Sequence, residues 1–382
     1  MKKSAGRDPS ATIRIMSDTT QQIDRHGPSN RFGVDYALDA KALGPPPCPI
    51  IDMHAHIGGG RAAELYVEAM DLFGVESVCS MTRLEAVEDV RSVLGDRIRF
   101  NAVPDWTNPD RSDAFGQGFL DRIRRFHDHG ARLMKLFAAP RMRDSELEWG
   151  TPGILALDSP RYRAAAELGQ SLGMAIMTHV ADPDTWFEAK YQDAERYGTK
   201  RDQYTPLERM LDDFTGPWIA AHFGGSPEDL TFLDGLLERH PNLHLDTSAC
   251  KWMLRELGAT PSDELRAFLT TWRGRVFFGS DIVVVDAHLE TEGTDNELAA
   301  KAGNRQQAFD LYASRYATLR RMFEGDGRFE SPIVDPDLHM VDPQRHAADA
   351  APMVECHQLP KDLLVDLYRG AAETLLKKLD SN

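Results

Sequence analysis

Residues 49–56, PIIDMHAH, form a short apolar run that ends in two histidines, and seven further apolar runs follow it along the chain. Stretches with helical periodicity separate these runs, and this alternation is typical of a parallel sheet with crossover helices. Eight strand–helix units over about 230 residues predict a (β/α)8 TIM barrel of α/β class. The predicted strands are Pro49–His54, Val75–Met81, Ile98–Pro104, Arg132–Phe137, Met174–His179, Trp218–Phe223, Leu243–Thr247 and Val276–Asp281.

Local signals also set the expected limits of the barrel. Helix starts are predicted at Ser159-Pro160, Thr205-Pro206 and Ser226–Asp229. An open doubly wound sheet is the alternative, but the glycines at 58–60 and 116–118 do not form its phosphate loop. We therefore expect an N-terminal, partly irregular arm over 1–47 and the barrel over 48–382. The latter includes a C-terminal extension with helices at Arg305–Phe323 and Lys361–Leu379 around a Pro/Asp-rich stretch, 331–360.

Composition excludes several classes of function. The 382 residues are 42% hydrophobic, and 44 Lys and Arg against 60 Asp and Glu give a net charge of −16, which disfavours nucleic acid as a partner. No apolar run suits a membrane helix, and the first twenty residues lack the apolar core of a secretory signal. The four cysteines are scattered, so we expect free thiols, a cytoplasmic location, a small-molecule substrate and a homo-oligomer, with a dimer as the first guess.

Polar residues end four of the predicted strands. His54 and His56 lie two apart on the first strand, so their imidazoles point the same way and can converge on a metal ion. His179 ends the fifth strand, His222 lies at the end of the sixth and Asp281 ends the eighth. Because the carboxyl ends of all strands meet on the active face of a barrel, these five residues predict a metal site.

Other polar residues allow simpler interpretations. The pair His127 and His129 ends a helix, on the opposite face, and should be structural. Asp246, which ends the seventh strand, faces the site by position but could simply cap the next turn. His339, His346 and His357 are expected at the surface. Long loops after strands four and five hold residues that either bind substrate or pack on the barrel, and these are Arg141, Arg143, Glu146, Glu148, Trp149, Trp186, Phe187, Tyr191 and Arg196.

Lys135 lies within the apolar fourth strand, where its charge must be paired or removed. Three interpretations remain open. The lysine is either carbamylated and bridges two metal ions, or binds an anionic substrate as an ammonium, or points outward between helices.

The order of these residues resembles the amidohydrolase superfamily. The flanking text IIDMHAHI, AHFGG, HPNLHLDTSA and FGSDI is similar to its amidohydrolase-2, or aminocarboxymuconate-semialdehyde-decarboxylase-like, branch, and LYRGAAETLL is similar to the branch's closing helix, with Ala371 in place of an asparagine. The resemblance implies that His54, His56, His179 and Asp281 bind one metal, commonly Zn²⁺, with His222 as acid/base or polarising group. If Lys135 is carbamylated, the resemblance implies a second metal ion that Lys135, His179 and His222 share.

The expected activity follows from the metal and its neighbours. A divalent ion, most readily Zn with Mn, Fe or Co as alternatives, lowers the pKa of its water and polarises a carbonyl, while Asp281 takes a proton. The sequence thus predicts a metal-dependent hydrolase of a small amide, lactone or ester-like carbonyl compound, with Asp281 and His222 as catalytic residues. A non-oxidative decarboxylase is the first alternative, and a barrel that binds a metal or ligand without turnover is the second. We expect a single-metal site.

Overall fold

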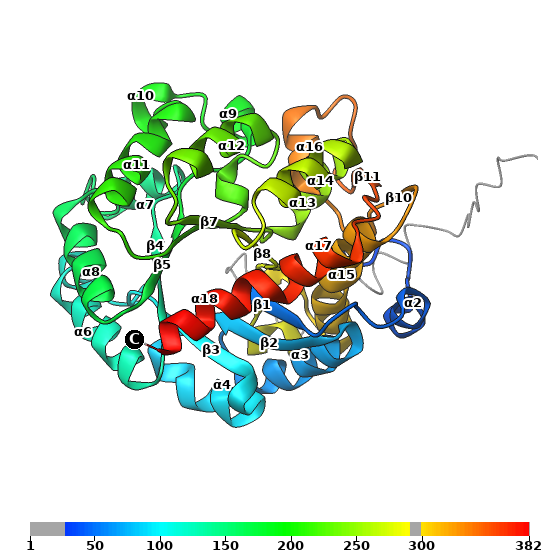
Figure 1. The fold of residues 1–382 in the computed structure, drawn as a ribbon, viewed down its shortest axis with the longest axis horizontal. Coiled ribbons are helices and arrows are strands. Elements are labelled where there is room, and N and C mark those ends of the chain that lie inside the picture. Colours follow the sequence, from blue (N-terminus) through cyan, green and yellow to red (C-terminus); the bar gives the residue numbers. More distant parts are fainter. Residues whose placement is uncertain (1–26, 291–298, 382) are drawn as a thin grey trace, which may run out of the picture.

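A parallel sheet stands at the centre of the computed structural model, which describes residues 27–290 and 299–381 (Figure 1). Each of the eight predicted strand regions forms a strand, with ends that differ by a few residues. The strands are β1 Ile50–Ile57, β2 Val75–Ser80, β3 Ile98–Ala102, β4 Leu133–Phe137, β5 Ala175–His179, β6 Trp218–Ala220, β7 Leu243–Asp246, β8 Val276–Phe277 and β9 Ile282–Val284.

The sheet closes on itself through the last of these regions. β8 pairs with β7, with Val276 opposite Leu245, and β9 pairs with β1, with Ile282 opposite Ala55. Between them the backbone stays bonded to β1, because the Met53 amide donates to the Phe278 carbonyl at 2.9 Å and the Asp281 amide donates to the His54 carbonyl at 2.8 Å. β8 and β9 are therefore two halves of one interrupted eighth strand, and the (β/α)8 barrel is confirmed.

Helices follow the strands and cover the barrel. Ser159 caps its helix as predicted by accepting a hydrogen bond from the Tyr162 amide, with Pro160 in the first turn. The start predicted at Ser226 is wrong, because Asp229 is the residue that accepts from a first-turn amide, that of Phe232. The helices of the barrel region are α3 Gly60–Phe73, α4 Val87–Leu94, α5 Arg111–Ala114, α6 Gln117–Asp128, α7 Met142–Glu148, α8 Pro160–Ser171, α9 Asp184–Ala189, α10 Ala194–Tyr197, α11 Tyr204–Asp213, α12 Leu230–Arg239, α13 Cys250–Glu256 and α14 Ser262–Thr271.

The segments on either side of the barrel pack against it. In the part of the arm that the structure describes, α2 (Tyr36–Leu43) packs on α15 (Arg305–Glu324), which also packs on α3. The antiparallel pair β10 (Arg328–Glu330) and β11 (Met353–Glu355) flanks α16 (Pro336–Val341). The predicted last helix forms as α17 (Lys361–Val365), the π turn η8 (Asp366–Gly370) and α18 (Ala371–Asp380), and it runs across the barrel strands in Figure 1.

Two sequence expectations concern the whole chain. All four cysteines are free thiols, as predicted. Within residues 27–290 and 299–381, the structure has no helix of sufficient length and apolar character to cross a bilayer.

Candidate metal centre

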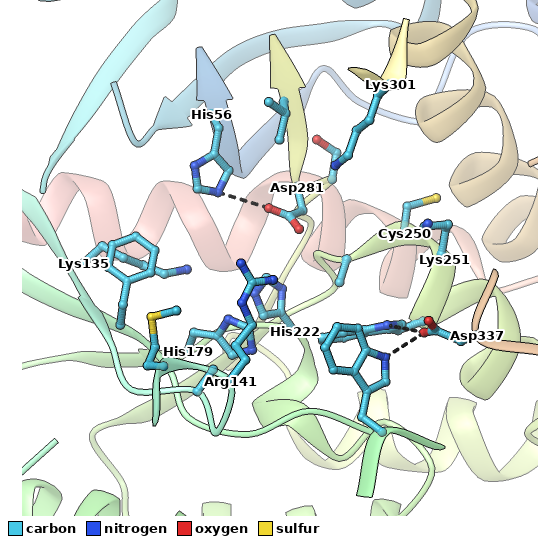
Figure 2. Close-up of a pocket in the computed structure, with 18 of the residues that line it drawn as sticks. His56, Lys135, Arg141, His179, His222, Cys250, Lys251, Asp281, Lys301 and Asp337 are labelled. Atoms are coloured by element: carbon cyan, nitrogen blue, oxygen red, sulfur yellow. Dashed lines mark hydrogen bonds and ion pairs between the residues drawn. The ribbon is translucent and has the colours of Figure 1, made fainter. Parts of the chain in front are cut away.

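The predicted strand-end residues meet in one cavity. It has a volume of about 600 Å³, and His56, Lys135, His179, His222 and Asp281 all line it. His54 lies behind them, fully buried, with its ring centroid 5.6 Å from that of His56 and 4.9 Å from that of His222. Figure 2 shows side chains from both sides of the barrel pointing into this space. The parallel register of the strands thus brings together residues that lie more than 200 positions apart.

The backbone around the cavity is strained. Among the described residues, five that are not glycine have a positive φ, and four of them follow β6, β7 and β8. These four are His222, Phe223, Ala249 and Asp281, with φ between 54° and 62°. A left-handed conformation is costly for such residues and persists where the surrounding structure enforces it, most often at functional sites.

Among the described residues, His54, His56 and Asp281 form one of two groups that could hold a metal ion, and the other is His54, His222 and Asp246. Oδ1 of Asp281 lies 3.1 Å from Nε2 of His56 and 3.6 Å from Nε2 of His54. A metal requires neutral imidazoles and an ionised carboxylate. Burial, followed by the charge of Lys135, lowers the pKa of His54 to about 4. Burial alone would raise the pKa of Asp281, but the hydrogen bond from His56 and the neighbouring histidines hold it well below its usual value. The three residues therefore fit a divalent transition metal such as Zn²⁺.

Asp246 holds His54 in position through a buried hydrogen bond. Its Oδ2 accepts a hydrogen bond from Nδ1 of His54 at 2.8 Å. Its Oδ1 accepts from the backbone amides of His222 at 2.9 Å and Ser248 at 3.1 Å, and also from the Ser248 hydroxyl. Both oxygens are thus engaged, and the residue is fully buried. Asp246 orients His54 so that Nε2 faces the cavity, the arrangement usual behind metal-binding histidines.

His222 is held by a similar contact. Its Nδ1 lies 2.8 Å from the Ser248 hydroxyl, so Nε2 is the ring nitrogen left for a ligand. Burial, and then the nearby His179, lower the pKa of His222 well below its usual value, and the ring is therefore neutral near pH 7. Sequence reasoning missed Ser248, whose only signal is its position two residues after the strand-ending Asp246.

His179 lies in the cavity but is engaged with another residue. Its Nε2 is 2.7 Å from Oδ1 of Asp182, and Oδ2 of Asp182 accepts a hydrogen bond from the Tyr191 hydroxyl at 2.6 Å. In the described part of the chain, the three-residue groups whose donor atoms lie within 4.8 Å of one another do not include His179. Its role as a metal ligand stays a prediction. Asp182 was also missed, although it follows His179 by only three residues.

Lys135 points into the barrel. Its side chain is 1% exposed, and Nζ lies 3.1 Å from Nε2 of His54. The interpretation that it points outward between helices is therefore wrong, because β4 turns it towards the strand-end residues. Burial lowers its pKa to about 8, against the charges of Asp246 and Asp281. An ammonium that binds an anion and a carbamylated amine both remain compatible with this position.

Two of the four aromatic residues predicted in the long loops, Trp149 and Trp186, line the cavity, whereas Phe187 and Tyr191 do not. Trp149 and Arg141 line it after β4, and Trp186 lines it after β5. Trp186 and Trp252 both donate their indole N–H to Oδ2 of Asp337, at 2.8 and 3.1 Å (Figure 2). Arg143, Glu146 and Arg196 instead line a separate depression. The loop after β4 thus contributes residues to the cavity and to the separate depression.

The structure also tests the predicted positions of histidines outside the cavity. His127 and His129 stand at the end of α6, where His129 lies 3.1 Å from Glu88, and both are absent from the cavity wall. The prediction that His357 is a surface residue is wrong, since it is fully buried. Its ring bonds the Ser262 hydroxyl and the Leu257 carbonyl, which anchor the tail to the α13–α14 connection.

Comparison with known proteins gives distant structural likeness only. No family model and no curated protein matches the chain. An amidohydrolase from Burkholderia multivorans is 12% identical with a TM-score of 0.40, over 86% of this chain and 99% of that one. Yeast dihydroorotase is 12% identical with a TM-score of 0.39, over 79% and 86% of the two chains. A Bacillus subtilis HMG-CoA lyase is 12% identical with a TM-score of 0.37, over 73% and 94%. Scores this low assign no family, and the function is argued from the site.

Proposed function

We propose that this protein is a metal-dependent hydrolase that uses water to attack a small carbonyl compound. The observation that carries the proposal is the convergence of His54, His56 and Asp281 at a cavity, with Asp246 holding His54 from behind. Bound by these donors, a divalent ion would polarise the substrate carbonyl and lower the pKa of the attacking water. The donor set favours a single Zn²⁺, with Mn, Fe and Co as alternatives.

Asp281 and His222 supply the proton chemistry. Oδ1 of Asp281 is near both histidines of β1, and Oδ2 has no partner among the described residues. The carboxylate is held ionised, so Oδ2 accepts a proton from an entering water. His222 is neutral, and its Nε2 can bond the substrate oxygen or take up a proton and return it to the leaving group.

The family proposal rests on the sequence text. The order of His54, His56, His179, His222 and Asp281 on the barrel strands is similar to that of the amidohydrolase superfamily. We place the chain in the amidohydrolase-2 branch on the segments that flank these residues.

Product analysis tests the proposal against its rival. The protein is purified, its metal is measured, and it is assayed with N-acetyl amino acids and γ-lactones in ¹⁸O-labelled water, before and after chelation. We expect one metal per chain, ¹⁸O in the product and loss of turnover on chelation. Release of carbon dioxide without ¹⁸O incorporation would replace the hydrolase with a decarboxylase. Turnover that survives complete metal removal would overturn both.

A further inference from the structure

Three cations that took no part in the sequence predictions line the cavity beside Asp281. Lys251 lies on α13, Lys301 ends a short turn before α15, and Arg315 lies on α15. Figure 2 shows Lys251 and Lys301 on one side of Asp281, with Lys135 on the other. The cations thus form a positive wall that is separate from the donors of the metal centre.

None of the three has a carboxylate partner in the parts of the chain that the structure describes. Among those residues, no ion pair within 4.0 Å involves Lys251, Lys301 or Arg315. Asp335 and Asp337, whose charges act on Lys251, already pair with Arg255. The carboxylate whose charge acts on Lys301 and Arg315 is that of Asp281. The guanidinium of Arg315 is positioned rather than neutralised, since its Nη1 donates to the hydroxyls of Ser29 at 2.7 Å and Ser314 at 2.9 Å.

Such an arrangement is costly without a ligand. Three like charges brought together in a partly buried wall repel one another and lose hydration. The chain as a whole carries a charge of −16, so the positive wall runs against the composition of the protein. An anion that enters the cavity would offset both costs, and a guanidinium flanked by ammonium groups is suited to an oxyanion.

We propose that Lys251, Lys301 and Arg315 form a subsite for an anionic group, a carboxylate or a phosphate, carried by the substrate away from the carbonyl that is attacked. The inference rests on the proposed function for the carbonyl that is attacked. The subsite itself binds an anion whether or not the metal is present. The indole of Trp252, one residue from Lys251, also lines the cavity, and its ring centroid lies 5.6 Å from that of His222. The substrate therefore carries a compact apolar body between its anionic group and its carbonyl.

Calorimetric titration tests the subsite on the full chain. The probes are glutarate, its neutral diamide glutaramide and inorganic phosphate, each added to metal-loaded protein and to protein freed of metal and chelator by dialysis. The variants are Lys251→Met and Lys301→Met, and Lys378→Met on the exposed side of α18 is the control. We expect an anion to bind wild type in both metal states, no binding of glutaramide to metal-free protein, and about tenfold or more weaker anion binding in each cavity variant. Their metal content should equal that of wild type.

The outcomes separate the subsite from the metal centre. Tighter binding of glutarate assigns a carboxylate, and tighter binding of phosphate assigns a phosphoryl group. If wild type holds no metal as purified and takes up none on reconstitution but still binds an anion, the subsite stands and the proposed hydrolase is wrong. Cavity variants that bind both anions as wild type does, while folding normally by circular dichroism, would overturn the subsite and leave the hydrolase untouched.

Discussion

Asp246 accepts a hydrogen bond from Nδ1 of His54 at 2.8 Å, with both side chains fully buried. The bond places the proton on Nδ1 of His54 and leaves Nε2 unprotonated, with a lone pair for a metal on the side of His56 and Asp281. The carboxylate also bonds the amide of His222, so one buried residue sets the position of two histidines of the site. The centre thus depends on a residue that does not itself reach the cavity.

This relationship predicts the effect of Asp246→Asn. The amide is close in shape but is a weaker acceptor and can present its NH₂ to the ring, so Nε2 loses its fixed orientation. Metal affinity should fall by about 10–100-fold. The measurement is the dissociation constant for Zn²⁺ by competition with a chelating dye. Asp121→Asn, an exposed change on α6, is the control, and equal affinity in the two variants would refute the role of Asp246.

The donor assignment predicts metal loss in His54→Ala and His56→Ala. Each change removes one imidazole from a small ligand set, and affinity depends on the number of ligands. Metal content per chain, measured by mass spectrometry after dialysis, should approach zero in both. His127→Ala and His129→Ala should keep the wild-type content. The same measurement on His179→Ala decides whether that residue is a ligand, which we propose.

Asp281→Asn should reduce turnover far more than it reduces stability. Asparagine keeps the volume but cannot accept a proton from water, and removal of a general base costs about 10²–10⁴-fold. Turnover on the substrate found in the product assay and the midpoint of thermal unfolding are the two readouts. A variant with nearly full turnover would contradict the assignment of Asp281 as the proton acceptor.

Lys135→Ala discriminates between the two interpretations that the structure leaves. For the single-metal site that we propose, metal content stays at one per chain, and the Michaelis constant rises or turnover falls because an ammonium beside the substrate is lost. Two metals per chain in wild type, dependent on bicarbonate during reconstitution and reduced in the variant, would instead show a carbamylated lysine.

Asp52 predicts a pH dependence of stability. It lies beneath the site, where Ser280 and Tyr316 donate to its Oδ2 at 2.6 and 2.8 Å. Burial raises its pKa from 3.8 to about 6 in the folded protein. Between these values the folded state binds more protons than the unfolded chain, so the contribution of Asp52 is fully present at low pH and is lost as pH rises through about 6.

Comparison with Asp52→Asn isolates that contribution. The free energy of unfolding of metal-free wild type, minus that of the variant, should fall by about 2 kcal/mol between about pH 4 and pH 7. Urea denaturation across this range gives the difference. A difference that is constant or grows with pH would show that the Asp52 carboxyl is not disfavoured as an anion.

The sequence by itself determined the barrel and most of the residues around the cavity. Alternation of apolar runs with helical periodicity is a local property, and parallel strands place all their carboxyl ends on one face. The convergence of His54, His56, His179, His222 and Asp281 at one end of the barrel follows from that geometry alone.

Only the tertiary structure decided which atoms meet. Asp246 and His54 are 192 residues apart, and their contact depends on the packing of strands that close the barrel. The inward direction of Lys135 and the burial of His357 depend likewise on neighbours that no local pattern encodes. The cations Lys251, Lys301 and Arg315 belong to segments with no shared motif, and the fold of α13 and α15 over the barrel is the physical reason that they form one wall.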